Sequence, residues 1–358
     1  MDKSNFQKGA SNLLFQCAGC KAGDKVLIVG EAGADPFFEP ELAQDLAHVA
    51  TQFGMVAQCL LARPSHSADD FPQDVFKAME DADITIFCSR LGDQLRFMPS
   101  VGQSTKVMIY TLTRAHLASE FGTTDYAVSE RIVERLVEVI SSASRYHICA
   151  ADGTNIRSEL VINQADTDLV PFSLRLFPTT IFPPIGFRNV NGTLMIDHFT
   201  LSSSTRSYDD SVLIIPSPLR ATVENGIMTS FEGDPDVITA FKAQCARAAS
   251  ITGGEPFRLN SWHAGVNPYT FFEGNPYDDL ERWGTVSYAS PRYTHIHAAG
   301  KDPGDLAIQI FDASISFDDE WIWKDGRFVF LDRPDIHELL KDAGMGHVSS
   351  ETRLSIGI

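Results

Sequence analysis

The sequence predicts an α/β N-terminal domain with a parallel, Rossmann-like sheet, followed by a β-rich α+β C-terminal domain carrying the candidate site. Over the first 150 residues, short apolar runs alternate with helical spacings. After residue 150, short β-prone runs punctuated by Pro and Gly replace them. The length of 358 residues suits two ordinary domains. We place the boundary near residue 150, which gives domains 1–150 and 151–358.

The N-terminal domain is predicted from alternating strand and helix patterns. Residues 25–30 are a short apolar run typical of a buried parallel strand, and further strands are expected at residues 56–61, 84–88 and 107–110. Apolar residues recur at helical spacing within residues 41–53, 75–79 and 129–142. Strands and helices that alternate in this way form a parallel sheet covered by helices.

The C-terminal domain is predicted from short β-prone runs that turn signals separate. The runs occupy residues 177–181, 183–186, 192–197 and 212–216, and Asn225-Gly226 marks a hairpin turn. One helix is expected at residues 235–250. Residues 284–330 again favour strands, with a second hairpin turn at Lys324-Asp325-Gly326-Arg327. This pattern favours an antiparallel sheet.

Composition limits the classes of function. The apolar fraction of 44% and the charged fraction of 21% are those of a globular protein. The 29 Lys and Arg against 47 Asp and Glu give a formal net charge of −18, which repels phosphate backbones and anionic membranes. We therefore expect no nucleic-acid or membrane partner. Without an apolar signal segment at the N-terminus, we expect a cytoplasmic protein.

The six cysteines are scattered through the chain, which favours buried reduced thiols over a disulfide framework. Cys17 and Cys20 form an isolated CxxC. A zinc ribbon needs a second pair, and a thioredoxin-like pair opens a helix after a strand, whereas this pair precedes the first predicted strand. We interpret the pair as structural.

The stretch Tyr293-Thr294-His295-Ile296-His297 is the most informative for function. Two histidines spaced i, i+2 in a strand project from the same face, so they can aim two nitrogen ligands at one ion. The chain has only 10 histidines, so this is a local concentration. From spacing alone, a solvated strand face is the simpler interpretation, because no flanking residue completes a standard metal motif.

Four stretches, in this order, carry a family resemblance. They are Cys17-Ala18 with Ala22-Gly23-Asp24 before the first strand, Gly153-Thr154-Asn155-Ile156, Gly192-Thr193-Leu194-Met195-Ile196-Asp197, and His263-Ala264-Gly265-Val266-Asn267-Pro268 with Glu281-Arg282-Trp283-Gly284-Thr285. The chain resembles the aminopeptidase T-like metalloprotein family, which includes the 2,5-dihydroxypyridine 5,6-dioxygenases. The resemblance spans most of the chain. It implies a metal-binding C-terminal domain, a small-molecule substrate and a homo-oligomer.

The chain departs from the family's two-metal peptidase branch. The glutamate expected soon after Pro183 is missing, and Ser287 replaces the histidine expected after Gly284-Thr285. The late strand has Ile310 and Asp312 where that branch has His-x-Asp. The departures disfavour a two-metal aminopeptidase. The dioxygenase branch needs only one Fe(II), two histidines and a carboxylate, which this chain can supply.

We therefore expect a metal site made of His263, His295, His297 and Asp312, of which the resemblance implies His263 and Asp312. His263 approximates the early histidine of the dioxygenase branch, and Asp312 its terminal-strand aspartate. We infer that His295 or His297 replaces the lost histidine, and the sequence leaves open which one faces the site. Fe(II) is the expected cofactor, with Zn or Mn as alternatives.

Further polar residues are candidates for proton handling and substrate binding. The candidate catalytic residues are Tyr293, Tyr288 and His198, and the candidate substrate-binding residues are Arg157, Arg175 and Arg188. A tyrosine or histidine can move a proton, and an arginine can hold an anionic group by two parallel hydrogen bonds. The structural alternative is an exposed strand end for Asp197-His198 and an ordinary surface or core position for the others.

We expect a metal-dependent enzyme, most simply a non-haem Fe(II) ring-cleaving dioxygenase acting on a small hydroxylated aromatic or pyridine-type acid. One alternative is a metal-dependent hydrolase, aminopeptidase-like or amidase-like. Another is a metal-free relative that binds a small molecule or a peptide. A serine hydrolase has no support, because the sequence lacks a Gly-x-Ser-x-Gly elbow.

Overall fold

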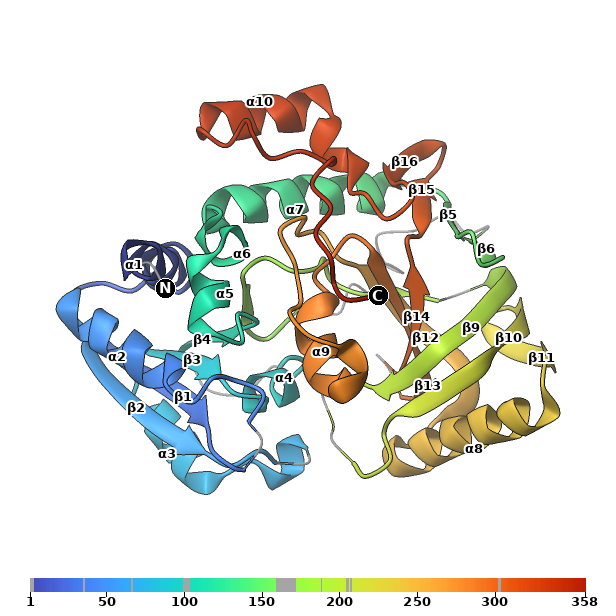
Figure 1. Cartoon of the computed structure of the whole chain (residues 1–358), viewed down its shortest axis with the longest axis horizontal. Helices are drawn as coiled ribbons and strands as arrows, with labels where there is room; N and C mark the ends of the chain where they lie inside the picture. The colour runs from blue at the N-terminus through green and yellow to red at the C-terminus, as the bar shows by residue number, and fades with distance from the viewer. Residues whose placement is uncertain are drawn as a thin grey trace. The chain divides into compact units, whose positions relative to one another are not determined.

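The computed structural model describes residues 3–34, 36–65, 67–98, 104–158, 172–187, 189–203, 206, 208–301 and 304–358. These residues form two compact units. The first contains the described residues within Met1–Glu130, Pro171–Thr180 and Ser204–Ser207. The second contains those within Arg131–Val170, Ile181–Ser203 and Tyr208–Ile358. The boundary predicted near residue 150 lies inside the second unit, because helix α7 (Tyr126–Ser142) leads directly into strands of that unit (Figure 1).

The first unit has the predicted parallel sheet, in the order β2-β1-β3-β4-β7. Its strands are β1 (Lys25–Glu31), β2 (Val56–Ala62), β3 (Ile84–Cys88), β4 (Thr105–Ile109) and β7 (Arg175–Phe177). The helices are α1 (Lys3–Ser11), α2 (Leu42–Gln52), α3 (Gln73–Glu80), α4 (Leu91–Gln94), α5 (Arg114–Ala118) and α6 (Glu120–Thr123). Strand β3 is buried along its whole length, as the run of apolar residues predicted.

Strand β7 corrects one expectation. Residues 177–181 were expected to belong to the antiparallel domain, but β7 ends at Phe177 and pairs in parallel with β4 of the first unit. Its apolar residues Leu176 and Phe177 are buried there. The sequence of so short a strand does not indicate which strand it pairs with. The pairing of β7 with β4 therefore could not be predicted from the local pattern.

The second unit is a large antiparallel sheet. The described strands follow the order β10-β11-β12-β13-β14-β9-β6-β5-β15-β16; β8 also pairs with β12, and β9 also pairs with β10. They are β5 (Tyr146–Cys149), β6 (Asn155–Ser158), β8 (Ile185–Gly186), β9 (Val190–Ser202), β10 (Leu213–Glu224), β11 (Ile227–Glu232), β12 (Glu255–Ala264), β13 (Tyr293–Gly300), β14 (Leu306–Phe311), β15 (Ser314–Phe317) and β16 (Glu320–Trp323). The β9–β10 pairing closes the series from β10 to β9 into a ring.

The helices of this unit are α8 (Pro235–Thr252), α9 (Leu280–Ser287) and α10 (Pro334–Asp342). Helix α9 corrects the expectation that strands begin at residue 284. The Asp279 side chain accepts a hydrogen bond from the backbone N–H of Arg282, which caps the helix, and Trp283 and Val286 face the interior. No helix in the described part of the chain is long and apolar enough to span a bilayer.

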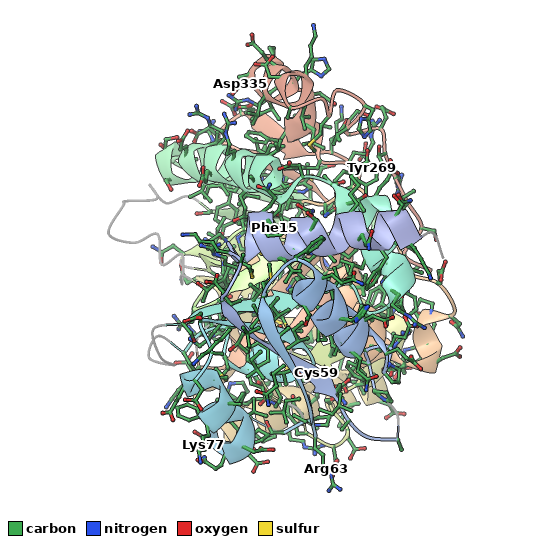
Figure 2. The ribbon with its side chains drawn as sticks, turned by 90° about the vertical axis from the view of Figure 1, so that its left-hand side faces the viewer. Phe15, Cys59, Arg63, Lys77, Tyr269 and Asp335 are labelled. Atoms are coloured by element: carbon green, nitrogen blue, oxygen red, sulfur yellow. The ribbon has the colours of Figure 1, made fainter. Side chains whose placement is uncertain are left out.

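All six cysteines are free thiols. Cys17 ends a π-helix, η1 (Asn12–Cys17), and is fully buried, and burial raises the pKa of its thiol. Burial also raises the pKa of Cys20 to about 12. Such thiols keep their protons at neutral pH and are poor nucleophiles. Cys59 lies on β2, and Arg63, just past that strand, points outward into solvent (Figure 2).

Strand β10 offers a direct test of the burial pattern. Ile215 is 3% exposed and its neighbour Ile214 is 48% exposed, because successive side chains point to opposite faces. We expect Ile215→Ala to lower the free energy of unfolding by about 2–5 kcal/mol, and Ile214→Ala by less than about 1 kcal/mol. Urea denaturation of both variants measures the difference. Equal losses would contradict the assigned register.

Candidate metal centre

Three histidine side chains converge in the second unit. His263 lies on β12, and His295 and His297 lie on β13. The Nε2 atom of His263 is 2.6 Å from Nε2 of His295 and 3.1 Å from Nε2 of His297. Within the residues that the structure describes, these three form the one group of His, Cys, Asp or Glu side chains placed to hold a metal ion. Their exposed fractions are 0%, 6% and 7%.

The register of two antiparallel strands creates this group. His263 lies directly opposite His295, and Ser261 lies opposite His297. Directly opposed residues of an antiparallel pair project from the same face, and so do residues i and i+2 of one strand. Both histidines of the i, i+2 pair therefore face the site, which answers the question that the sequence left open. The third histidine comes from the neighbouring strand.

The three rings fit a divalent metal ion. Zn–N bonds of about 2.0–2.1 Å place two ligand nitrogens about 2.8–3.4 Å apart, for bond angles between 90° and tetrahedral. The nitrogen separations of 2.6 and 3.1 Å around His263 are close to this range, so a small outward shift of one ring admits an ion. Nδ1–H of His263 donates to the Phe182 carbonyl oxygen at 3.3 Å, which leaves the Nε2 lone pair facing the other rings. The candidate donor set is three imidazole nitrogens.

Aromatic side chains surround the histidines. The Tyr293 and Tyr288 rings lie 5.3 and 6.0 Å from the His295 ring, between centroids. Burial raises the pKa of Tyr293, and a hydrogen bond from Gln309 offsets this only in part. At neutral pH the Tyr293 hydroxyl therefore keeps its proton and can donate a hydrogen bond. Trp283 of α9 packs edge-on against Tyr293 at 5.4 Å and adds to this apolar wall.

The structure does not bring Asp312 into the histidine group. Asp312 follows β14 with a φ of +50°, which turns the chain out of the strand. Its carboxylate accepts two hydrogen bonds from Arg292, at 2.9 and 3.1 Å, and pairs with Arg353 at 2.8 Å. The two guanidinium groups supply the positive charge that a metal ion would otherwise bring. Within the described residues, the group that could hold an ion thus contains a third histidine and no carboxylate.

The other candidate residues lie apart from this group. His198 is half-exposed on β9, 3.9 Å from the Asp197 carboxylate, with the edge of its ring against Phe311. Arg157 is exposed on β6, where it lines an open groove of about 700 Å³ with Trp321. Arg175 belongs to the first unit and donates to the Cys17 carbonyl oxygen. Arg188 lies outside the described residues.

Gln309 is a neighbour of the site that the sequence reasoning missed. It lies directly opposite His295 in the pairing of β13 and β14, and it is 3% exposed. The available signal was its polarity, because every other residue of β14, Leu306–Phe311, is apolar. A lone buried amide within an apolar strand marks a position where a polar group is needed.

No family model and no curated protein matches the chain. Two solved structures are similar to it over most of their length. The 2,5-dihydroxypyridine dioxygenase from Pseudomonas putida KT2440 has a TM-score of 0.56 and 12% identity, covering 90% of this chain and 95% of that chain. AmpT from Thermus thermophilus has a TM-score of 0.52 and 11% identity, with 92% and 100% covered. At this identity the likeness shows the fold alone, and it confirms a distant fold relationship to both proteins.

Metal binding should depend on each of the three histidines. We expect about one Co(II) or Zn(II) per chain, and we expect His263→Ala, His295→Ala and His297→Ala each to weaken binding at least about 100-fold. Isothermal titration of the metal-free protein measures this. His198→Ala is the control, because that exposed ring lies outside the group. If the control and the three variants bind the metal equally well, the three histidines are not its ligands.

Substitution of Asp312, in contrast, should affect stability and not metal binding. Asp312→Asn removes the charge that pairs with Arg292 and Arg353, so we expect the free energy of unfolding to fall by about 1 kcal/mol. The number of metal ions bound per chain should not change. Loss of the ion in this variant, measured by elemental analysis after gel filtration, would make Asp312 a ligand.

Proposed function

We propose that this chain is a single-metal enzyme in which His263, His295 and His297 hold one divalent ion. The convergence of three buried imidazole nitrogens is the observation that carries the proposal. Three histidine ligands leave coordination positions open, which is typical of catalytic rather than structural metal sites. A bound ion would act as a Lewis acid that coordinates the substrate and activates O₂ or water.

The protein's own groups have separate roles in this proposal. The three histidines fix the position of the ion, and the hydrogen bond from His263 to the Phe182 carbonyl oxygen fixes the tautomer of one of them. Tyr293 keeps its proton and donates a hydrogen bond to an oxygen of the substrate. The rings of Tyr288 and Trp283 help to exclude bulk water, which strengthens the electrostatic interactions inside.

The first candidate reaction is ring cleavage by O₂ at Fe(II), with a small hydroxylated aromatic or pyridine-type acid as substrate. The aromatic side chains beside His295 support it, because they suit a flat, largely apolar substrate. The solved dioxygenase of similar fold adds support at the level of fold. In this candidate the third histidine takes the place of the carboxylate usual in such Fe(II) sites.

The second candidate is a metal-dependent hydrolase with one ion. The observation that favours it is the absence of a carboxylate from the described ligand group. Three neutral imidazoles leave the full double charge on the ion, and such a charge lowers the pKa of a coordinated water molecule most strongly. The two-metal version has no support, because the described residues provide one group of ligands.

Metal content and reaction type together test the proposal. We expect protein purified without chelator, or loaded anaerobically with Fe(II), to hold about one ion per chain, through the three histidines. It should then consume O₂ with one member of a panel of dihydroxylated benzoates and dihydroxypyridines. The His295→Ala/His297→Ala double variant is the control and should do neither.

The alternatives give different results in the same experiment. If the protein holds Zn(II) or Mn(II), takes up no O₂ and cleaves an amino-acid anilide, it is a hydrolase and not a dioxygenase. Failure to bind any of Fe(II), Mn(II), Co(II) or Zn(II) would overturn both candidates and leave a metal-free binding protein.

A further inference from the structure

Gln309 has a buried side-chain acceptor that finds no hydrogen-bond partner within the described residues. Its side-chain nitrogen donates to the Ala307 carbonyl oxygen at 3.3 Å and also reaches the Tyr293 hydroxyl. Its side-chain oxygen, Oε1, is buried and accepts no hydrogen bond from any residue that the structure describes. An unsatisfied buried amide oxygen costs free energy, so a group from outside the described chain is needed to satisfy it.

The position of Gln309 directs this acceptor toward the metal centre. Gln309 lies opposite His295, and His295 lies opposite His263, so the three side chains project from the same face of neighbouring strands. The amide of Gln309 therefore lies on the side of the sheet that carries the three imidazoles. A molecule held by the three histidines would bind on the same side of the sheet as this buried acceptor.

Packing alone does not explain a glutamine at this position. The neighbouring residues Ile308 and Ile310 are fully buried on the other face, and an apolar side chain of similar size, such as methionine, would fill the space without an unsatisfied oxygen. The unpaired oxygen destabilises the free protein, and it forms a hydrogen bond only when a ligand supplies a donor. A buried group of this kind gives strong selectivity, because a ligand that lacks the donor leaves it unpaired.

We infer that Gln309 is a specificity-determining residue whose Oε1 accepts a hydrogen bond from an O–H or N–H group of a metal-coordinating small molecule. This inference rests on the proposed function, since the ligand is held by the ion of the three histidines. The ligand class is a small chelating molecule with a hydrogen-bond donor next to its coordinating atoms. A molecule with an ether or N-alkyl group at that place is rejected.

Acetohydroxamic acid and N-methylacetohydroxamic acid test this selectivity. Both chelate a divalent ion through two oxygens, but only the first has an N–H. With Co(II)-loaded protein, titrated by visible absorption, we expect the N–H compound to bind at least about tenfold more tightly. In Gln309→Met this preference should fall to within about twofold, whereas Gln309→Glu, which keeps an acceptor oxygen, should retain it.

A matched control separates the acceptor from general effects of the substitution. Gln244→Met makes the same change at another buried glutamine, whose side chain bonds with Thr200 and the Ser211 carbonyl oxygen, and it should keep the preference. A preference that persists in Gln309→Met would be steric and would overturn the inference, as would equal binding of the two compounds by the unsubstituted protein. Failure of the unsubstituted protein to bind Co(II) would instead overturn the proposed metal centre.

Discussion

The hydrogen-bonded register between β12 and β13 is the constraint on which the candidate site depends. It sets His263 opposite His295 and leaves His297 on the same face. A slip of one residue would turn one strand's side chains to the other face and separate the three nitrogens. The opposite face holds Trp262 and Ile296, both fully buried, so the same slip would also expose the core. The packing of that core therefore maintains the register, and the register maintains the ligands.

Much of the fold was predictable from the sequence, for local physical reasons. Buried parallel strands are continuous apolar runs, and such runs marked β1, β3 and β4. Strand β2 was also found, although it lies at the sheet edge and most of its side chains are not buried. The elements that were predicted wrongly depend on pairing with a distant strand or on a helix N-cap. Strand β7 joins the first sheet through pairing with β4, and α9 begins at the Asp279 cap inside a segment that favoured strands. Neither the partner of a short strand nor the strength of a single cap follows from composition.

The candidate site was predictable in part. The i, i+2 spacing of His295 and His297 requires a shared face once the segment is a strand, and the structure brings both to His263. Asp312 was expected to be a ligand because it resembles the terminal-strand aspartate of the dioxygenase branch. Its carboxylate instead pairs with Arg292 and Arg353, which lie 20 and 41 positions away in the sequence. Gln309 was missed because its importance depends on which strand pairs with β13. Spacing along one strand is visible in a sequence, and pairing between strands is not.

The burial of the three histidines has a kinetic consequence. None of the three histidine residues is more than 7% exposed, so their nitrogens have little direct contact with solvent. An ion that enters through a transient opening of the covering side chains would do so at a rate set by local stability. The centre would therefore exchange its ion slowly. The identity of the ion in the cell would depend on which metal was available during folding as well as on relative affinities.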